Sequence, residues 1–168
     1  MVLLRHSNIT IDQATDAVFV IQGLFSHEDR IDRDKEHFYV MHLDSRRHIS
    51  LVELVAIGVL TDVKIHPRET FRRAVIEGTD SIIVAHNHPT GDMTPSENDS
   101  KVTTHLCKAG EILQIPLLDH IIFTAQGGDF FSFQDNKTQS ILQTQRKKYA
   151  MKNSRDGKGV KQHYEISQ

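Results

Sequence analysis

Two histidines separated by one residue, His86 and His88, follow a short apolar run at residues 81–85. Such a run predicts a strand that is covered on both faces. Because side chains alternate along an extended chain, the two imidazoles point to the same side and can share a target. Zinc binds imidazole nitrogens, and a catalytic zinc site commonly has three protein ligands and an open fourth position. The pair therefore predicts part of a zinc site that needs one more ligand.

The third ligand is expected at the start of the next helix. Thr94 and Glu97 have the spacing of a capping box, and Pro95 suits the first helical position. Asp99 is then free of a capping role and lies in the first turn, where the helix dipole favours a carboxylate. We therefore predict Asp99 as the third metal ligand.

A glutamate in an unusual setting is the candidate general base. Glu53 falls on a predicted strand, where alternation places it on the same face as the apolar residues Leu51 and Val55. A buried carboxylate needs a partner that offsets its desolvation, and a zinc-activated water is such a partner. We therefore predict Glu53 as the general base. Ser96, on the same face of the helix as Asp99, is the candidate donor to the oxyanion of the tetrahedral intermediate.

The elements that must position these residues alternate between helices and strands. Residue periodicity and turn signals predict helices over 12–25, 66–78 and 95–112, and strands over 38–43, 49–60, 81–85, 117–124 and 130–133. The first two strands and the last two are expected to form hairpins. The order is typical of an α/β layered domain, in which ligands bind where strand ends meet helix starts.

The spacing of these residues resembles the JAMM family of zinc metalloproteases, also called JAB/MPN. Its pattern is a distant glutamate, then H-x-H, seven residues, S, two residues and D, which the chain reproduces at His86, His88, Ser96 and Asp99. The closest similarity is to the RadC-like branch of that family. The segments that carry it are HPRE at 66–69, AHNHPTGD at 85–92, PS at 95–96 and LDH at 118–120.

The resemblance covers roughly residues 12 to 135. It implies a single three-layer α/β domain with a mixed sheet, of the JAB/MPN-like and cytidine-deaminase-like architecture. It also implies zinc on His86, His88 and Asp99, with Glu53 as the base and Ser96 as the oxyanion donor. The function expected is that of a peptidase or isopeptidase that cleaves an amide bond in a protein or peptide by zinc-activated water.

Other functions were weighed against the same residues. A zinc deaminase needs a Cys-x-x-Cys pair, which a chain with one cysteine excludes. An HNH nuclease disperses its named residues over a hairpin and a helix, unlike residues 86–88. A non-catalytic or DNA-associated RadC-like protein stays open as the alternative. Larger RadC-like proteins carry an N-terminal helix-hairpin-helix DNA binder, and the chain is expected to lack one, which weakens any DNA-repair role.

Two further features leave alternatives open. His120 beside Asp119 is either a partner that orients the metal site or a histidine satisfied by its neighbouring carboxylate. Residues 137–168 carry eight basic and two acidic residues, so this segment is either a solvated terminus or a contact for nucleic acid. We therefore expect a domain over residues 1–136 and a basic extension over 137–168.

Composition sets the remaining bounds. With 168 residues, 38% apolar and 25% charged, the chain is expected to form one domain with its own core. The single cysteine, Cys107, fits a reducing compartment, so the predicted location is the cytoplasm. No segment has the length and apolar character of a membrane span or a targeting signal. No oligomeric state is predicted.

Overall fold

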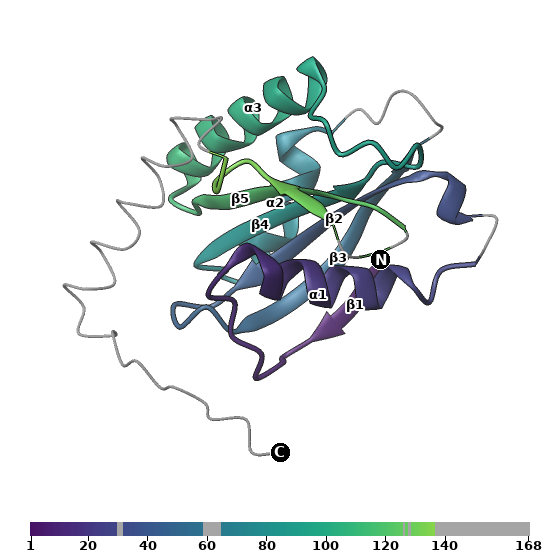
Figure 1. Cartoon of the computed structure of the whole chain (residues 1–168). Helices are drawn as coiled ribbons and strands as arrows, with labels where there is room; N and C mark the ends of the chain where they lie inside the picture. The colour runs from purple at the N-terminus through teal and green to yellow at the C-terminus, as the bar shows by residue number, and fades with distance from the viewer. Residues whose placement is uncertain (30–31, 59–64, 126, 128, 137–168) are drawn as a thin grey trace.

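A computed structural model describes residues 1–29, 32–58, 65–125, 127 and 129–136, so the predicted extension over 137–168 lies outside the described residues. Figure 1 shows the elements along the chain. They are β1 (Val2–Arg5), α1 (Ala14–Phe25), a short 3-10 helix (Asp32–Asp34), β2 (Glu36–Leu43), β3 (Ile49–Gly58), α2 (Pro67–Ile76), β4 (Ser81–Asn87), α3 (Glu97–Leu113), β5 (Leu117–Phe123) and β6 (Phe130–Ser132). None of the helices in this part of the chain has both the length and the apolar character that crossing a bilayer requires.

The strands form one mixed sheet in the order β1-β3-β2-β4-β5-β6. Strands β4 and β5 run parallel, and every other neighbouring pair is antiparallel. Both predicted hairpins, β2–β3 and β5–β6, are confirmed. The sequence did not predict β1, which pairs with β3 at the edge of the sheet.

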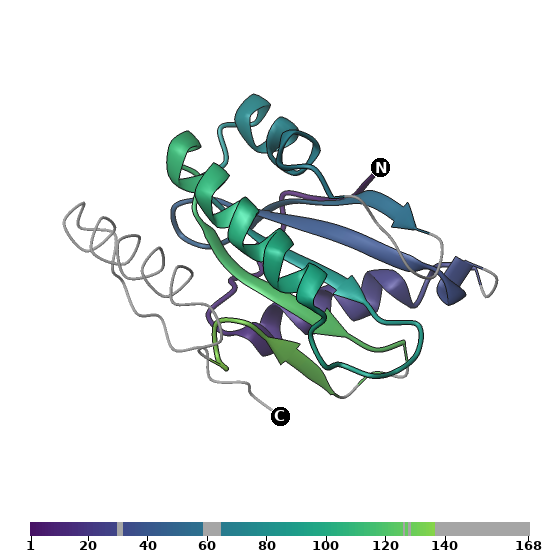
Figure 2. The ribbon, with the colours of Figure 1, turned by 90° about the horizontal axis from the view of Figure 1, so that it is seen from above.

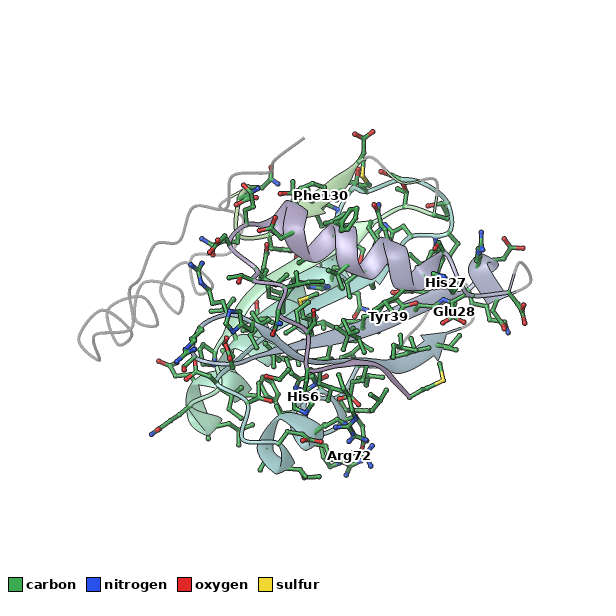
Figure 3. The ribbon with its side chains drawn as sticks, turned by 90° about the horizontal axis from the view of Figure 1, so that it is seen from below. His6, His27, Glu28, Tyr39, Arg72 and Phe130 are labelled. Atoms are coloured by element: carbon green, nitrogen blue, oxygen red, sulfur yellow. The ribbon has the colours of Figure 1, made fainter. Side chains whose placement is uncertain are left out.

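Helices cover both faces of the sheet, which confirms the predicted three-layer α/β fold. Helix α1 packs on one face, and α2 and α3 pack on the other (Figures 1 and 2). Figure 3 shows the α1 face, with Tyr39 beneath that helix and Arg72 of α2 on the opposite side. Tyr39 is fully buried, and Phe130 is partly buried against the same apolar cluster. Each face therefore has its own apolar core between sheet and helices.

Strand β4 lies in the middle of the sheet and is buried at every position, as its continuous apolar run predicts. The carboxyl end of β4 lies beside that of β5. From the end of β4 the chain passes through a loop into α3. The segment after α3 folds back against the helix because Gly110 has no side chain: a Cβ there would lie 2.5 Å from the carbonyl oxygen of Ile115. This close approach lets the chain turn tightly from the end of α3 into β5.

Candidate metal centre

The three predicted ligands come together where β4 ends and α3 begins. The Nε2 atom of His86 lies 3.2 Å from Asp99 Oδ1, and that of His88 lies 3.6 Å from Asp99 Oδ2. The two Nε2 atoms are 3.0 Å apart. One donor atom from each residue lies within 4.8 Å of the other two. The side chains of the strand histidines and of Asp99 in the first helical turn thus converge, as their spacing in the sequence predicts.

The chemistry of this cluster fits a divalent cation. Two imidazole nitrogens and a carboxylate repel one another at such distances unless a cation or a shared proton lies among them. Two histidines and one carboxylate also match the ligand set of catalytic zinc, which keeps its fourth position open. His86 and Asp99 are buried, whereas His88 is half-buried, so the cluster is reached from the His88 side.

The protonation of the cluster follows from its contacts. Burial raises the pKa of Asp99, but hydrogen bonds from His86 and His88 outweigh burial and hold that pKa far below its usual range. The hydrogen bond with Asp99 raises the pKa of His88 in turn. A cation at this position therefore replaces protons that the imidazoles otherwise share with the carboxylate.

His88 is oriented by the loop that follows it. Its Nδ1 lies 2.6 Å from the carbonyl oxygen of Asp92, and a carbonyl can only accept, so Nδ1 carries a proton and Nε2 faces the cluster. Gly91 donates its backbone N–H to the carbonyl of His88 at 3.0 Å and has a φ of +79°. That left-handed conformation suits glycine, and it turns the chain so that Asp92 returns to the imidazole.

The cap of α3 differs from the sequence prediction. The helix begins at Glu97, and its N-cap is Ser96 rather than Thr94. Ser96 Oγ accepts the backbone N–H of Asp99 at 3.1 Å and donates to Asp99 Oδ2 at 2.6 Å. The backbone N–H of Ser96 donates to the same Oδ2 at 2.7 Å. Asp99 therefore belongs to the capping box, which fixes Oδ2, and it faces His86 with Oδ1.

Glu53 is not brought to the cluster. Glu53 of β3 pairs with Val40 of β2, and Val40 pairs with Val84 of β4. Two strand spacings, roughly 10 Å, therefore separate Glu53 from β4, and it lies level with Val84 rather than with His86. Its Oε1 lies 3.1 Å from His42 Nε2, and its Oε2 accepts from Arg73 Nε at 3.1 Å. The carboxylate that sequence alternation correctly buries is thus neutralised by a histidine and an arginine, which corrects its predicted placement beside a zinc-bound water.

A different carboxylate, Glu36, lies beside the ligands, and the sequence reasoning missed it. Its Oε1 is 3.9 Å from His86 Nε2. Glu36 is the first residue of β2, two positions before Phe38, which pairs with His86. The predicted strand over 38–43 began two residues too late to include Glu36. The signal that identifies it is the pairing of β2 with β4, a long-range contact.

Asn87, between the two histidines, ties Glu36 to β4. Its side chain points to the other face of the strand and accepts the backbone N–H of His37 at 2.7 Å. It also donates to the carbonyl of Lys35 at 3.0 Å. These two residues flank Glu36 on either side. The middle residue of the motif thereby anchors the backbone that carries the nearby carboxylate.

His120 is shown to be a partner of the cluster. Its backbone N–H donates to Asp119 Oδ1 at 2.7 Å, so Asp119 binds the main chain and not the ring. The ring nitrogen Nε2 instead lies 2.9 Å from Nδ1 of His86. Of the two interpretations that the sequence left open, the structure favours a residue that orients the site.

Fold and cluster together define a three-layer α/β domain with two histidines and one aspartate, arranged as a group that could hold a metal ion, at the carboxyl end of a central strand. The family model described as the RadC-like JAB domain matches residues 11–138, and the chain belongs to this family. The JAMM resemblance is thereby confirmed at the level of the family.

Relatives of the chain are UPF0758 proteins. Those of Chlorobaculum tepidum and Pelodictyon phaeoclathratiforme are 42% and 46% identical to it over 132 residues, which are 79% of this chain and 56% of each relative. That of Geotalea uraniireducens is 45% identical over 111 residues, 66% of this chain and 47% of the relative. The chain thus spans about half the length of these relatives.

Proposed function

We propose that this protein is a zinc-dependent metallohydrolase of the JAMM type, a peptidase or isopeptidase that cleaves an amide bond in a protein or peptide. One observation carries the proposal: His86, His88 and Asp99 converge on one point, and Glu36 reaches to 3.9 Å from His86. A ligand triad with a carboxylate beside it is the minimum that metal-assisted hydrolysis needs.

The ligand residues prepare the site for the cation. Both imidazoles present Nε2 to the cluster, and the capping box holds the carboxylate of Asp99 in place. Zinc held there would supply a Lewis acid that polarises the substrate carbonyl and activates water near neutral pH. His88 is the half-buried member of the cluster, so substrate would approach from its side.

Glu36 is proposed as the general base, in place of Glu53. It is the carboxylate beside His86, and its neighbours in the chain are fixed by Asn87. From this position it would take the proton of the attacking water and pass it to the leaving amine. Ser96 lies beside Asp99, and turning its hydroxyl hydrogen away from Oδ2 would let it donate to the oxyanion.

The experiment measures zinc content and amide cleavage on the full chain. Wild type, Glu36→Gln and Asp99→Asn are compared by metal analysis and by assays on fluorogenic peptide mixtures and isopeptide-linked conjugates. We expect about one zinc ion per chain in wild type and in Glu36→Gln, and much less in Asp99→Asn. Cleavage should fall by about 10²–10⁴ in Glu36→Gln.

Each other result has a definite reading. Wild type that binds zinc but cleaves none of these substrates would favour a partner-binding protein with the same fold. Wild type that binds no zinc would reject the metallohydrolase. Equal cleavage by wild type and Glu36→Gln would remove Glu36 from the reaction.

A further inference from the structure

We propose that His120 and Thr103 are positioning residues that keep the proton of His86 on Nδ1 and so direct its Nε2 at the cation. The inference rests on the proposed function in taking His86 as a zinc ligand. It goes beyond that function because it gives a role to two buried residues, neither of which is a proposed ligand or base.

Three short contacts connect His86 to the backbone of α3. Nδ1 of His86 lies 2.9 Å from Nε2 of His120. Nδ1 of His120 lies 2.6 Å from Oγ1 of Thr103, and this hydroxyl lies 2.6 Å from the carbonyl oxygen of Asp99. The path starts at one ligand and ends at the main chain of another, so β4, β5 and the first turns of α3 are joined through side chains.

With a single proton on the His120 ring, only one placement of protons satisfies all three contacts. The Thr103 hydroxyl donates to the carbonyl of Asp99, because a carbonyl has no hydrogen to give. Since a hydroxyl has a single hydrogen, Oγ1 must accept from Nδ1 of His120. Nε2 of His120 is then bare and accepts from Nδ1 of His86. The reverse direction would leave two oxygens 2.6 Å apart with no hydrogen between them.

The surroundings of His120 bury the ring and fix its plane. The ring is fully buried. It stacks on Phe133 at a centroid distance of 4.9 Å and meets the edge of Phe38 at 6.0 Å. Full burial of the ring disfavours a second, charging proton, because a buried charge is costly. An imidazole with one proton has one bare nitrogen, which is what the path requires.

The two histidine ligands therefore receive the same orientation by different means. His88 gives its Nδ1 proton directly to a backbone carbonyl in the loop. His86 lies inside the sheet, where backbone carbonyls already pair between strands, and it reaches a carbonyl only through His120 and Thr103. Groups that orient a ligand in this way typically change metal affinity by 10- to 100-fold when they are removed.

Thr103→Val tests the path with a near-isosteric change, and Thr104→Val is the matched control. Thr103 and Thr104 both donate to the carbonyl four residues earlier, at 2.6 and 2.9 Å, but only Thr103 meets His120. Zinc affinity is measured by competition with a chelator. We expect affinity to fall by about 10- to 100-fold in Thr103→Val and to stay within about twofold of wild type in Thr104→Val.

A second measurement needs no folded variant of Thr103. Long-range ¹H–¹⁵N spectra of the metal-free and zinc-loaded wild-type protein report which ring nitrogen carries a proton. The signals of His86 are identified by their loss in His86→Asn. We expect a proton on Nδ1 of His86 in both states, and on Nδ1 but not Nε2 of His120.

The outcomes separate this inference from the proposed function. A bare Nδ1 on His86, or equal zinc affinity in Thr103→Val and Thr104→Val, would overturn the positioning role. Wild type without hydrolytic activity, but with zinc affinity that depends on Thr103, would reject the hydrolase and support the positioning role. If wild type bound no zinc at all, the spectra of the metal-free protein would still decide the proton placement.

Discussion

Replacing Glu53 by glutamine tests whether this buried carboxylate serves the fold or the reaction. Its side chain is 6% exposed and contacts His42 and Arg73 at 3.1 Å each. Glutamine keeps the shape and one oxygen acceptor. It removes the negative charge and sets an NH₂ group against one of the two partners. The change therefore breaks one charge-assisted contact and weakens the other.

The expected loss of stability follows from these contacts. Removing a whole partner from a buried ion pair costs about 3–5 kcal/mol, and one hydrogen bond to a charged group contributes about 1.5–3 kcal/mol. The Arg73 side chain is 29% exposed, so water replaces part of what it loses. We expect Glu53→Gln to lower the free energy of unfolding by about 2 kcal/mol at pH 7.

The loss should depend on pH. Burial raises the pKa of Glu53, but the hydrogen bonds and charges of His42 and Arg73 together lower it by more. The pKa of Glu53 therefore lies below its usual value of 4.5. A carboxylate whose pKa is lower in the folded state stabilises the fold above its unfolded pKa. This stabilisation is lost as the pH falls through the folded pKa. The difference between wild type and Glu53→Gln should therefore shrink below about pH 4.5.

Urea unfolding at pH 7 and below pH 4.5, with zinc content and substrate cleavage at pH 7, provides the test. If Glu53 is structural, Glu53→Gln should bind zinc and cleave substrate within a few-fold of wild type wherever it is folded. Unchanged stability together with loss of cleavage, alongside an active Glu36→Gln, would refute this reasoning and restore Glu53 as the base.

Three other changes have definite expected outcomes. Gly110→Ala should lower the free energy of unfolding by about 1–3 kcal/mol, because the added Cβ meets the Ile115 carbonyl. Gly23→Ala, where nothing lies within 4 Å of the added Cβ, should raise the free energy of unfolding by up to about 1 kcal/mol. Urea unfolding measures both. Ser96→Ala should cost about 1 kcal/mol of cap stability, and a fall in cleavage larger than its fall in zinc occupancy would support the oxyanion role. Burial raises the pKa of Asp119 to about 6, so its folded form holds a proton more tightly and stability should fall as pH rises from about 4 to 6. Asp119→Asn should not show that fall in stability. If the difference in unfolding free energy between wild type and Asp119→Asn did not change with pH, the prediction would be wrong.

Local patterns in the sequence were enough to predict most of the elements. The apolar run before His86 is buried on both sides because β4 lies in the middle of the sheet. The short edge strand β1 has no comparable signal. It is held instead by backbone pairing with β3, which begins with the terminal amine of Met1 bound to the carbonyl of Leu54 at 2.7 Å. Pairing of this kind depends on segments far apart in the chain.

The convergence of His86, His88 and Asp99 was predictable because their spacing reflects strand and helix geometry. The cap was not, since Thr94 with Glu97 and Ser96 with Asp99 have the same separation. Each pair fits a capping box, and the structure selects the second. Local spacing does not distinguish the two pairs. The structure distinguishes them because Asp99 also contacts His86 of β4, a contact between distant parts of the chain.

The position of the carboxylate beside the ligands needed knowledge of the sheet. Burial by alternation applies equally to any strand glutamate, and it pointed to Glu53. Only the pairing of Phe38 with His86 shows that Glu36 lies at the level of the cluster. The chemical motif is thus local in the sequence, whereas its supporting carboxylate depends on strand order.

The two hydrogen bonds of Asn87 have a consequence for the spacing of the cluster. Opening β2 from β4 would have to break the bonds to residues 35 and 37 before it could carry Glu36 away from the imidazoles. The distance between the Glu36 carboxylate and the imidazoles is therefore tied to the pairing of β2 with β4. Side chains elsewhere on the domain can change without altering that distance as long as this pairing is kept.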